Sequence, residues 1–405
     1  QIAEARNQAL PVTVFVGGPP ALILSAIAPL PENLPELMLA SLIAGERLDQ
    51  TAAPNGHPHP LIANAEFALM GHVAPKLRKP EGPFGDHYGY YSLQHDYPVF
   101  DVQRVAHRAD AIYPATVVGK PRQEDFFIGD LLQELLSPLF PLVMPAVQQL
   151  WSYGETGYHS LAGAVVKQRY AREAMASAFR ILGEGQLSLT KFLLVTDQPV
   201  DLKDFRATLE HVLARTHPET DLYVFANLSM DTLDYSGPEV NKGSKGVWLG
   251  LGTPVRDLPR TFSAAEVPQG VRDVRVFCGG CLVVEVPGYR DEPGIASRIG
   301  SHPAFAGWPL VVLTDDAARA TKSAMNFLWT TFTRFEPAAD ISAAGQRLVR
   351  HHIAYTAPVF IDARMKPWYP QEVSCRDDVA RRVTERWREY FPAGTVAMGD
   401  SERGH

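Results

Sequence analysis

The sequence predicts a mixed fold, α+β in its first portion and α/β in the rest. Runs of Val, Phe, Tyr and Ile with turn residues between them make residues 64–73 and 98–118 strand-rich. Farther along, short apolar strands alternate with helical patterns, and one strand–helix unit occurs twice. These observations predict a strand-rich layer followed by strands covered by helices.

The individual elements follow from local patterns. Residues 11–16 read as a strand, and residues 34–44 read as a helix that Gly45 ends. The spacing of apolar residues from Asp130 to Leu136 predicts a further helix, followed by an apolar run that prolines interrupt.

An internal repeat supports the α/β part. The segment Phe192-Leu-Leu-Val-Thr-Asp197 is followed by Arg215-x-x-Pro-x-x-Asp221. The segment Leu310-Val-Val-Leu-Thr-Asp315 is followed by Arg334-x-x-Pro-x-x-Asp340. The Asp-to-Arg spacing is 18 residues in one copy and 19 in the other. We interpret this as a duplicated βα unit, with chance similarity between two ordinary units as the alternative.

Composition excludes several classes of protein. The 405 residues are 46% hydrophobic and 20% charged, which is typical of a globular chain and too apolar for disorder. The net charge of −7 disfavours a nucleic-acid partner, because such proteins present a basic face to the phosphate backbone. Three cysteines cannot form a disulfide framework, so we expect a reducing compartment.

The stretch from Leu10 to Pro31 contains no charged residue and is long enough to raise the question of a membrane span. Gly17-Gly-Pro-Pro20 interrupts it, however, and predicts a strand, a turn and a short helix instead. We therefore expect no membrane span, and the start of the chain lacks the pattern of a signal peptide.

The segment Glu81-Gly-Pro-Phe-Gly-Asp86-His87-Tyr-Gly-Tyr-Tyr91, here called the signature loop, is the strongest candidate for chemistry. Gly-Pro-Phe-Gly disfavours a helix, so a tight loop sets the spacing of the two carboxylates and can aim both at one point. Apolar surroundings would raise the pKa of at least one and keep it protonated. His87 and the tyrosines add further groups that can carry protons. The alternative is a turn with solvated charges.

The signature loop resembles that of the UbiD family of decarboxylases, which use prenylated FMN. Weaker matches follow in order along the chain: Pro29–Glu36, Ala63–Glu66, Phe100–Pro114, Gly119–Pro121, Thr190–Asp197 and Gly243–Lys245. The resemblance runs from near residue 9 to about 255, and residues 260–405 fit less obviously. It implies a flavin-binding portion similar to part of a split β-barrel, followed by an α/β domain with the repeated unit.

The resemblance also implies a reaction and residue roles. An aromatic or α,β-unsaturated carboxylic acid would lose CO₂ through an adduct with prenylated FMN, in a reaction that can run backwards. Asp86 matches the proton donor and Glu81 its partner carboxylate. Glu36 matches a carboxylate that ligates a divalent metal beside the flavin phosphate, Mn²⁺ first and K⁺ as a further candidate ion. Lys245 matches a phosphate-contacting lysine, with Lys242 as the alternative.

One departure concerns the start of the chain. The family's catalytic arginine, the Asn and His that complete its metal site and its flavin-phosphate loop all lie upstream of the first match. The chain opens with Gln1 rather than Met, so we expect either a truncated chain or one that another chain completes, holding the cofactor poorly alone. The alternative function is a non-catalytic or partner-completed subunit or oligomerisation module. A plain FMN oxidoreductase is disfavoured, because hydride transfer does not need the paired carboxylates.

Other patterns favour structural roles. Cys278-Gly-Gly-Cys281 could be a redox pair or half a zinc site, but two strands meeting at Gly-Gly with buried thiols is the preferred interpretation. His57-Pro-His59 is expected in a surface loop, and His351-His352 on the solvated face of a helix. Helical spacing places Phe327, Trp329, Phe332 and Phe335 in the core, Asp315-Asp316 ends a buried strand, and Gly250-Leu-Gly252 is too generic for a nucleotide loop.

The expected organisation has four parts: a flavin-binding split-barrel portion at 1–125, a helical linker at 126–160, an α/β domain at 161–265, and a second α/β unit with a helical tail at 266–405. We expect a small carboxylic acid as substrate, a homodimer or homohexamer in the cytoplasm, and a prenylated-flavin synthase as the supplier of the cofactor.

Overall fold

The computed structural model describes residues 2–28, 30, 34–119 and 123–394. The chain divides into two compact units. The first comprises Gln1–Gly85 and Tyr91–Val118, and the second comprises Asp86–Tyr90 and Gly119–His405. Within the weaker matches above, Pro29, Pro31, Glu32, Asn33, Lys120 and Pro121 lie outside the described residues. The boundaries expected at 125, 160 and 265 stay predictions.

The first unit is built on a three-stranded antiparallel sheet in the order β1-β4-β5. Its strands are β1 (Leu10–Val16), β4 (Phe67–Glu81) and β5 (His95–His107). They confirm the strand expected at 11–16 and most of the strand-rich runs, although no strand continues through 108–118. Ala68 and Met70 on β4 pack with Leu61 into a small core, because alternate residues of a strand share one face.

Short helices accompany this sheet. They are α1 (Ile2–Ala5), α2 (Pro20–Ala26) and α3 (Glu36–Ala44), with a two-stranded sheet of β2 (Gln50–Thr51) and β3 (Leu61–Ile62) and the 3₁₀ turn Pro54–Gly56. Gly45 ends α3 as expected: its φ is 72° and its N–H donates to the carbonyl of Leu42. Gly17 and Gly18, both at positive φ, separate β1 from α2 in the charge-free stretch.

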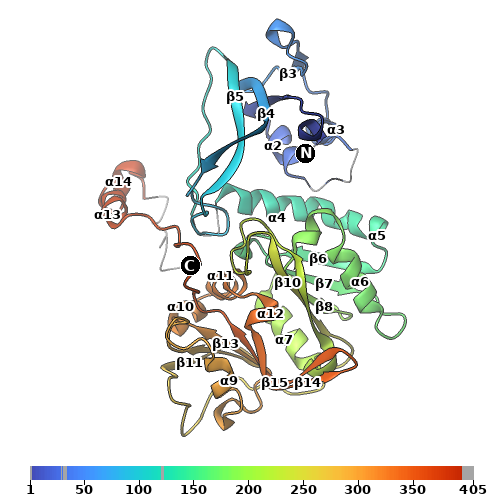
Figure 1. Ribbon diagram of the computed structural model, residues 1–405, viewed down its shortest axis with the longest axis vertical. Coiled ribbons are helices and arrows are strands. Elements are labelled where there is room, and N and C mark those ends of the chain that lie inside the picture. Colours follow the sequence, from blue (N-terminus) through green and yellow to red (C-terminus); the bar gives the residue numbers. More distant parts are fainter. Residues whose placement is uncertain (1, 29, 31–33, 120–122, 395–405) are drawn as a thin grey trace. The chain divides into compact units, whose positions relative to one another are not determined.

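The second unit contains two five-stranded sheets of the same topology (Figure 1). The first sheet has the order β6-β7-β8-β10-β9 and the second the order β11-β12-β13-β15-β14. In each, an antiparallel pair, two parallel pairs and a final antiparallel pair follow one another. The strands are β6 (Val147–Ser152), β7 (Leu161–Val166), β8 (Phe192–Thr196), β9 (Leu222–Ser229), β10 (Lys242–Gly250), β11 (Asp273–Cys278), β12 (Cys281–Glu285), β13 (Leu310–Thr314), β14 (Ile341–Val349) and β15 (His352–Asp362).

The repeat predicted from sequence is therefore confirmed, and it extends to individual hydrogen bonds. Asp221 accepts from the N–H of His217 at 2.7 Å, and Asp340 accepts from the N–H of Glu336 at the same distance. At the carboxyl ends of the central strands, Asp197 accepts from the N–H of Gly252, and its counterpart Asp315 accepts from the N–H of Met365, each at 2.7 Å.

Helices lie between and outside the two sheets. Helices α7 and α8 of the first copy and α11 and α12 of the second form the layer between them, since α8 contacts both β10 and β15. Helices α6 and α9 pack on the outer faces. The helices are α4 (Glu124–Leu136), α5 (Phe140–Val143), α6 (Glu173–Leu182), α7 (Phe205–Arg215), α8 (Pro218–Asp221), α9 (Ile295–Ile299), α10 (Ala317–Thr321), α11 (Ala324–Arg334), α12 (Pro337–Asp340), α13 (Asp377–Glu385) and α14 (Trp387–Tyr390), with 3₁₀ turns at Ser137–Leu139, Gly154–Thr156, Gly185–Leu189 and Pro303–Phe305.

The largest core lies in this shared layer. Phe327 of α11 stacks on Phe277 of β11 with ring centroids 3.7 Å apart, and both rings are buried. Phe192 of β8 meets Phe332 and Phe335 from the second copy. The helical spacing that predicted a core role for these aromatic residues is thus confirmed, and one apolar layer serves both sheets.

The structure bears on two further expectations about secondary structure. His351 and His352 were expected on a helix, which is wrong: they lie where β14 turns into β15, with Arg350 and His351 at φ values of 48° and 64°. The two residues at positive φ form a tight turn between paired strands, in which Val349 pairs with His352, and a helix cannot continue through such a turn. The range expected as a helical linker contains α4 and α5, and also strand β6.

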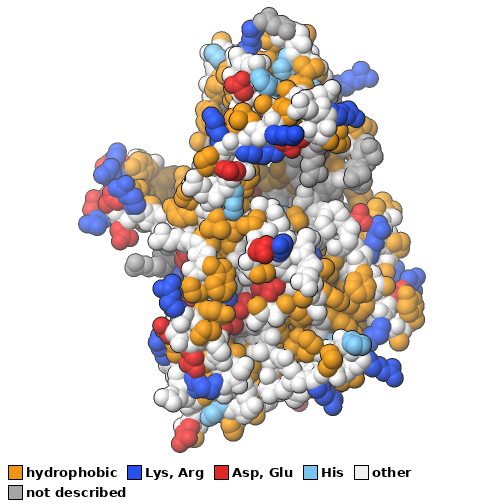
Figure 2. Space-filling model, in the orientation of Figure 1, with side chains coloured by type: hydrophobic (Ala, Val, Ile, Leu, Met, Phe, Trp, Pro, Cys, Tyr) orange, Lys and Arg blue, Asp and Glu red, His pale blue; other side chains and the backbone are white. Residues whose placement is uncertain are grey.

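One helical stretch, Glu124–Val143, is long and apolar enough to cross a membrane by length and composition alone, which is weak evidence for a span. It is not the charge-free stretch noted in the sequence. Helices α13 and α14 are surface helices whose ion pairs, Arg376–Asp378 and Arg386–Glu389, place charges of both signs side by side (Figure 2).

Candidate active site

The signature loop belongs to both units. Glu81 ends strand β4 and is exposed, and the loop closes as a hairpin in the first unit, where the N–H of Ser92 donates to the carbonyl of Phe84 at 2.7 Å. Gly82 has φ +99°, and a Cβ there would lie 2.8 Å from the carbonyl oxygen of Leu93. Glycine is therefore required at this turn.

The next five residues, Asp86–Tyr90, are held by the second unit. The N–H of Asp86 donates to the carbonyl of Tyr90 at 3.0 Å, which closes a tight turn. The indole N–H of Trp329 donates to the carbonyl of Tyr88 at 2.8 Å. Tyr88 and Tyr90 are buried in a cluster with Tyr235, Trp329 and Tyr369. The aromatic residues of the loop thus anchor it and place Asp86 and His87.

Asp86 is buried with one carboxylate oxygen unsatisfied. Its Oδ1 accepts from the N–H of Tyr88 at 2.7 Å, whereas Oδ2 has no hydrogen-bond partner within residues 2–28, 30, 34–119 and 123–394. Burial raises the pKa of Asp86 to about 7, and the negative charges of Asp231 and Asp234 add to the effect, against hydrogen bonds from Tyr88 and Tyr90. A carboxyl group of this kind can hold and release a proton near neutral pH.

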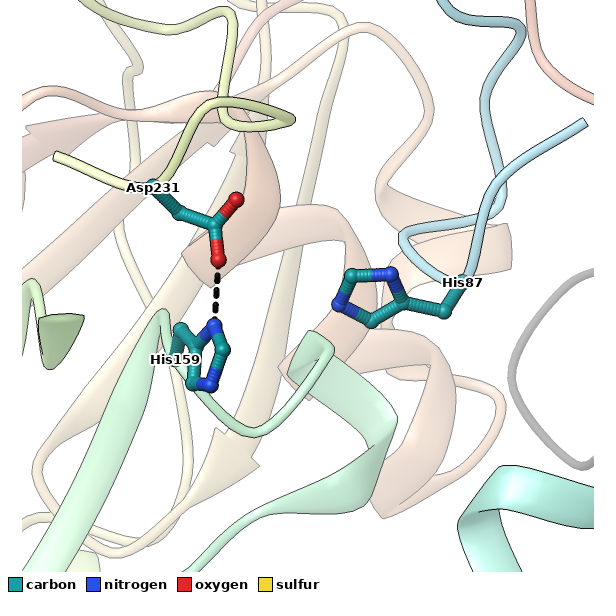
Figure 3. A group of neighbouring side chains, drawn as sticks. All are labelled: His87, His159 and Asp231. Carbon is teal, nitrogen blue, oxygen red and sulfur yellow. Dashed lines mark hydrogen bonds and ion pairs between the residues drawn. The ribbon is translucent and has the colours of Figure 1, made fainter. Parts of the chain in front are cut away.

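Beside it lies a group of His87, His159 and Asp231 (Figure 3). Nδ1 of His159 and Oδ2 of Asp231 share a short hydrogen bond, and the rings of His87 and His159 meet edge to face with centroids 6.2 Å apart. The three come from distant segments: the signature loop, the turn before β7 and the segment after β9. The structure therefore brings His87, a candidate from sequence, together with two residues that the sequence did not single out.

Neighbouring charges set the protonation of this group. Burial alone would raise the pKa of Asp231, but the hydrogen bond and the charge of His159 outweigh it and lower the pKa overall. Burial lowers the pKa of His87, and the positive charge of His159 acts in the same direction. At neutral pH the group therefore presents an ionised carboxylate and a neutral His87 imidazole.

Two buried lysines lie near the same edge of the first sheet. Lys191 precedes β8 and pairs with Asp234 at 2.7 Å, with both side chains 2% exposed. Lys245 lies on β10, and its ammonium donates to the carbonyl of Thr190 at 2.8 Å. Burial lowers the pKa of Lys245 to about 8, the charge of Lys191 lowers it further and Asp234 opposes the shift. The negative charge of Asp234 therefore acts on the pKa of both lysines.

Glu36 and Glu81, the other two candidates from sequence, are described in the first unit. Glu36 is the first residue of α3 and, like Glu81, is exposed. Both belong to the other unit from Asp86, and their roles stay predictions. His159, Asp231 and Asp234 were missed because they lie in ordinary turn sequences. Only Thr190-Lys191 was already part of a quoted match.

Two domain models of one protein family match this chain. Residues 1–121 match the 3-octaprenyl-4-hydroxybenzoate carboxy-lyase Rift-related domain, and residues 126–250 match the C-terminal domain of the same carboxy-lyase. A relative from Chlamydia pneumoniae, named as a subunit of 4-hydroxybenzoate decarboxylase, is 53% identical over 96% of this chain and 66% of its own length. The chain belongs to the UbiD family. The resemblance seen in the signature loop is thus confirmed.

Further relatives extend beyond the two matched domains. An uncharacterised protein of Chlamydia caviae is 51% identical over 96% of this chain, so the similarity includes the second sheet. This UbiD-family chain spans 66% of the length of the first curated relatives that it matches. The activity of the whole protein is therefore a matter for proposal.

Solved structures show the same fold. Vanillic acid decarboxylase of Sedimentibacter hydroxybenzoicus, in its closed form, is 25% identical with a TM-score of 0.57, covering 66% of this chain and 57% of that chain. The UbiD-class enzyme HmfF of Pelotomaculum thermopropionicum, solved in complex with FMN, is 22% identical with a TM-score of 0.54, covering 66% and 59%. The mixed α+β and α/β fold expected from sequence is confirmed.

Proposed function

We propose that this UbiD-family chain carries the proton-donating part of a decarboxylase that acts on an aromatic or α,β-unsaturated carboxylic acid with prenylated FMN. The observation that carries the proposal is Asp86, a buried carboxyl on the signature loop with a free oxygen and a pKa of about 7. The name of the chlamydial relative suggests 4-hydroxybenzoate as the first substrate to test.

Asp86 would deliver the proton that replaces the departing CO₂. The loop turn holds its Oδ1 through the N–H of Tyr88, so the proton resides on Oδ2, where no other described group competes for it. Buried surroundings keep solvent from the acid and favour its neutral form. Glu81 would act as the partner carboxylate, and His87 would belong to the same proton-handling group.

One residue of the second unit, Lys245, is suited to bind the phosphate of an anionic cofactor. Lys245 uses one of its three N–H groups on the carbonyl of Thr190, which leaves donors for a phosphate. When bound, prenylated FMN supplies an electron sink for loss of CO₂. Glu36 offers the hard oxygen ligand that Mn²⁺ prefers, with K⁺ as a second candidate ion.

A direct test uses the chain produced together with a prenylated-flavin synthase. Mass spectrometry of the bound cofactor should show the prenylated flavin, and purified protein should release CO₂ from 4-hydroxybenzoate. A Lys245→Met variant should retain less cofactor than Lys242→Met, because Lys242 is exposed and pairs with Glu239. Plain FMN with no CO₂ release from any acid tested would contradict the proposal.

A second function is favoured by a specific observation, since the relative in Chlamydia pneumoniae is named as a subunit. The chain would then be one part of a complex that another chain completes. Alone it would bind little flavin, and adding the remaining part of the protein or its partner would restore binding. Size-exclusion chromatography with light scattering would separate a homodimer or homohexamer from a mixed complex. We propose a cytoplasmic protein with no nucleic-acid partner and no membrane span.

A further inference from the structure

The group formed by His87, His159 and Asp231 has a chemistry of its own. We propose that these three side chains bind a divalent metal ion of the zinc class. The site shares His87 with the proton-handling group proposed above, but it is argued only from residues of the second unit and their arrangement.

The geometry suits one ion. One donor atom from each residue lies within 4.8 Å of the other two. Figure 3 shows the imidazole of His87 pointing toward the pair formed by His159 and Asp231. Ligands around a zinc ion lie about 2.0–2.2 Å from it, so donors this close can converge on it with small rotations of the side chains.

The segments that carry the donors are fixed. His159 is held on both sides, because its N–H donates to the carbonyl of Gly157 at 2.7 Å and its carbonyl accepts from the N–H of Lys191 at 2.8 Å. Oδ1 of Asp231 accepts from the N–H of Leu233 at 2.8 Å. His87 sits inside the turn that Asp86 and Tyr90 close. Donors on anchored loops favour binding over a chance encounter of mobile side chains.

The donor set decides the class of ion. Two imidazoles and one carboxylate suit Zn²⁺, Co²⁺, Ni²⁺ or Fe²⁺ better than Mg²⁺ or Ca²⁺, which prefer oxygen ligands. On binding, the proton of the hydrogen bond between His159 and Asp231 would leave to solvent, and the ion would take its place between the two groups. Three protein donors leave at least one position for water. His87 and His159 are half-buried and the side chain of Asp231 is 11% exposed, so an ion can reach the group from the side of the two histidines.

The test is a metal titration of the chain without a histidine tag, after treatment with EDTA. Wild type should take up one Zn²⁺, and Co²⁺ should give the visible absorption of a low-coordinate site. His87→Ala and His159→Ala should each weaken Zn²⁺ binding at least about tenfold. Asp231→Asn should also weaken Zn²⁺ binding. His217→Ala, an exposed histidine of the same unit, should leave binding unchanged. Glu36→Ala should also leave it unchanged, which separates this site from the predicted Mn²⁺ site.

Crystals soaked in Zn²⁺ give a test that does not depend on the variants folding. An anomalous difference peak between His87, His159 and Asp231 would support the site. A peak only elsewhere, no uptake by wild type, or equal affinities in His159→Ala and His217→Ala would overturn the proposal.

Discussion

The two sheets of the second unit share a topology but differ at one edge. Register within each sheet aligns Phe192 of β8 with Leu310 of β13, because each pairs with the next parallel strand at Gly246 and Val359 respectively. At the amino ends of the parallel strands, the first copy has His159, Lys191 and Lys245 where the second has Gly279, Pro309 and Pro358.

The opposite edge is alike in the two copies. Asp197 and Asp315 end the central strands and accept equivalent main-chain hydrogen bonds, and Asp221 and Asp340 close equivalent short helices. The residues that both copies keep therefore build the fold. At the three aligned positions of the amino-end edge, ionisable side chains stand in the first copy and Gly or Pro in the second, which agrees with the proposal that the chemistry lies at the edge of the first copy.

Buried charges in the second copy are paired for structure. Arg364 is fully buried, pairs with Asp362 at 2.6 Å and donates to three carbonyls, those of Pro287, Glu292 and Pro293. Lys366 pairs with Asp340 at 2.9 Å and donates to two carbonyls. By contrast, Asp86 beside the first copy keeps a free oxygen and a raised pKa. The comparison predicts different consequences for changes in each copy.

The largest effect is expected at Asp86. Asp86→Asn in the active holoenzyme should lower kcat for decarboxylation at least about 100-fold, because general acid catalysis contributes that much or more. Cofactor content should stay the same, because the substitution keeps the size of the side chain and the proposed phosphate contact is made by Lys245. Asp273→Asn, on the edge strand of the second sheet, is the control and should retain full activity. Wild-type turnover in Asp86→Asn would remove the residue from the donor role.

The second-largest effect is expected when the lysine of a buried ion pair is replaced. Lys191→Met should lower the free energy of unfolding by about 3–5 kcal/mol, because it leaves Asp234 buried without its partner. Lys366→Met should cost a similar amount through Asp340. Adding Asp234→Leu to Lys191→Met should recover much of the loss. Urea denaturation measures all of these, and a single variant as stable as wild type would show that the pair is not desolvated.

The pH dependence of stability isolates Asp86 when wild type is compared with Asp86→Asn, because burial also raises the pKa of Asp340 to about 6 and that contribution is common to both proteins. Its folded pKa, about 7, lies above the usual 3.8, so between these values the folded state holds a proton that the unfolded state has released. Stability from this residue is therefore lost as pH rises from about 4 to 7, at most about 4 kcal/mol in total. Asp86→Asn should be more stable than wild type at pH 8 and nearly equal at pH 4. Parallel stability curves at all pH values would contradict the raised pKa.

Sequence reasoning reached the repeat and the signature loop for physical reasons. Local apolar patterns and turn residues specify β8, β13, α3 and the tight loop at Gly82, and these were predicted. The sequence predicted that apolar surroundings would raise the pKa of at least one carboxyl of the signature loop, but not which residues surround Asp86. Asp231 and Asp234, which help to raise its pKa, lie far along the chain, and nothing in their own turn marks them as its neighbours.

The strand order depends on pairings between strands distant in sequence, which local periodicity does not encode. The error at His351–His352 is local instead, because Arg350 and His351, both at positive φ, turn β14 directly into β15, and these residue types do not mark such a turn in the sequence. The roles of Glu36, Glu81 and Lys245 rest on family resemblance, because no local pattern distinguishes a cofactor-contacting side chain from a solvated one.

The smallest effect is expected at the Cys-x-x-Cys pair of the second copy. Cys278 and Cys281 face each other across β11 and β12, and both are buried and free, as the preferred interpretation expected. Burial raises the pKa of the Cys281 thiol, which makes it a poor nucleophile. Cys281→Ala should therefore cost about 1–2 kcal/mol in unfolding free energy through lost packing and leave turnover unchanged. Turnover that fell in Cys281→Ala, or that responded to a thiol oxidant in wild type but not in the variant, would show that chemistry is not confined to the first copy.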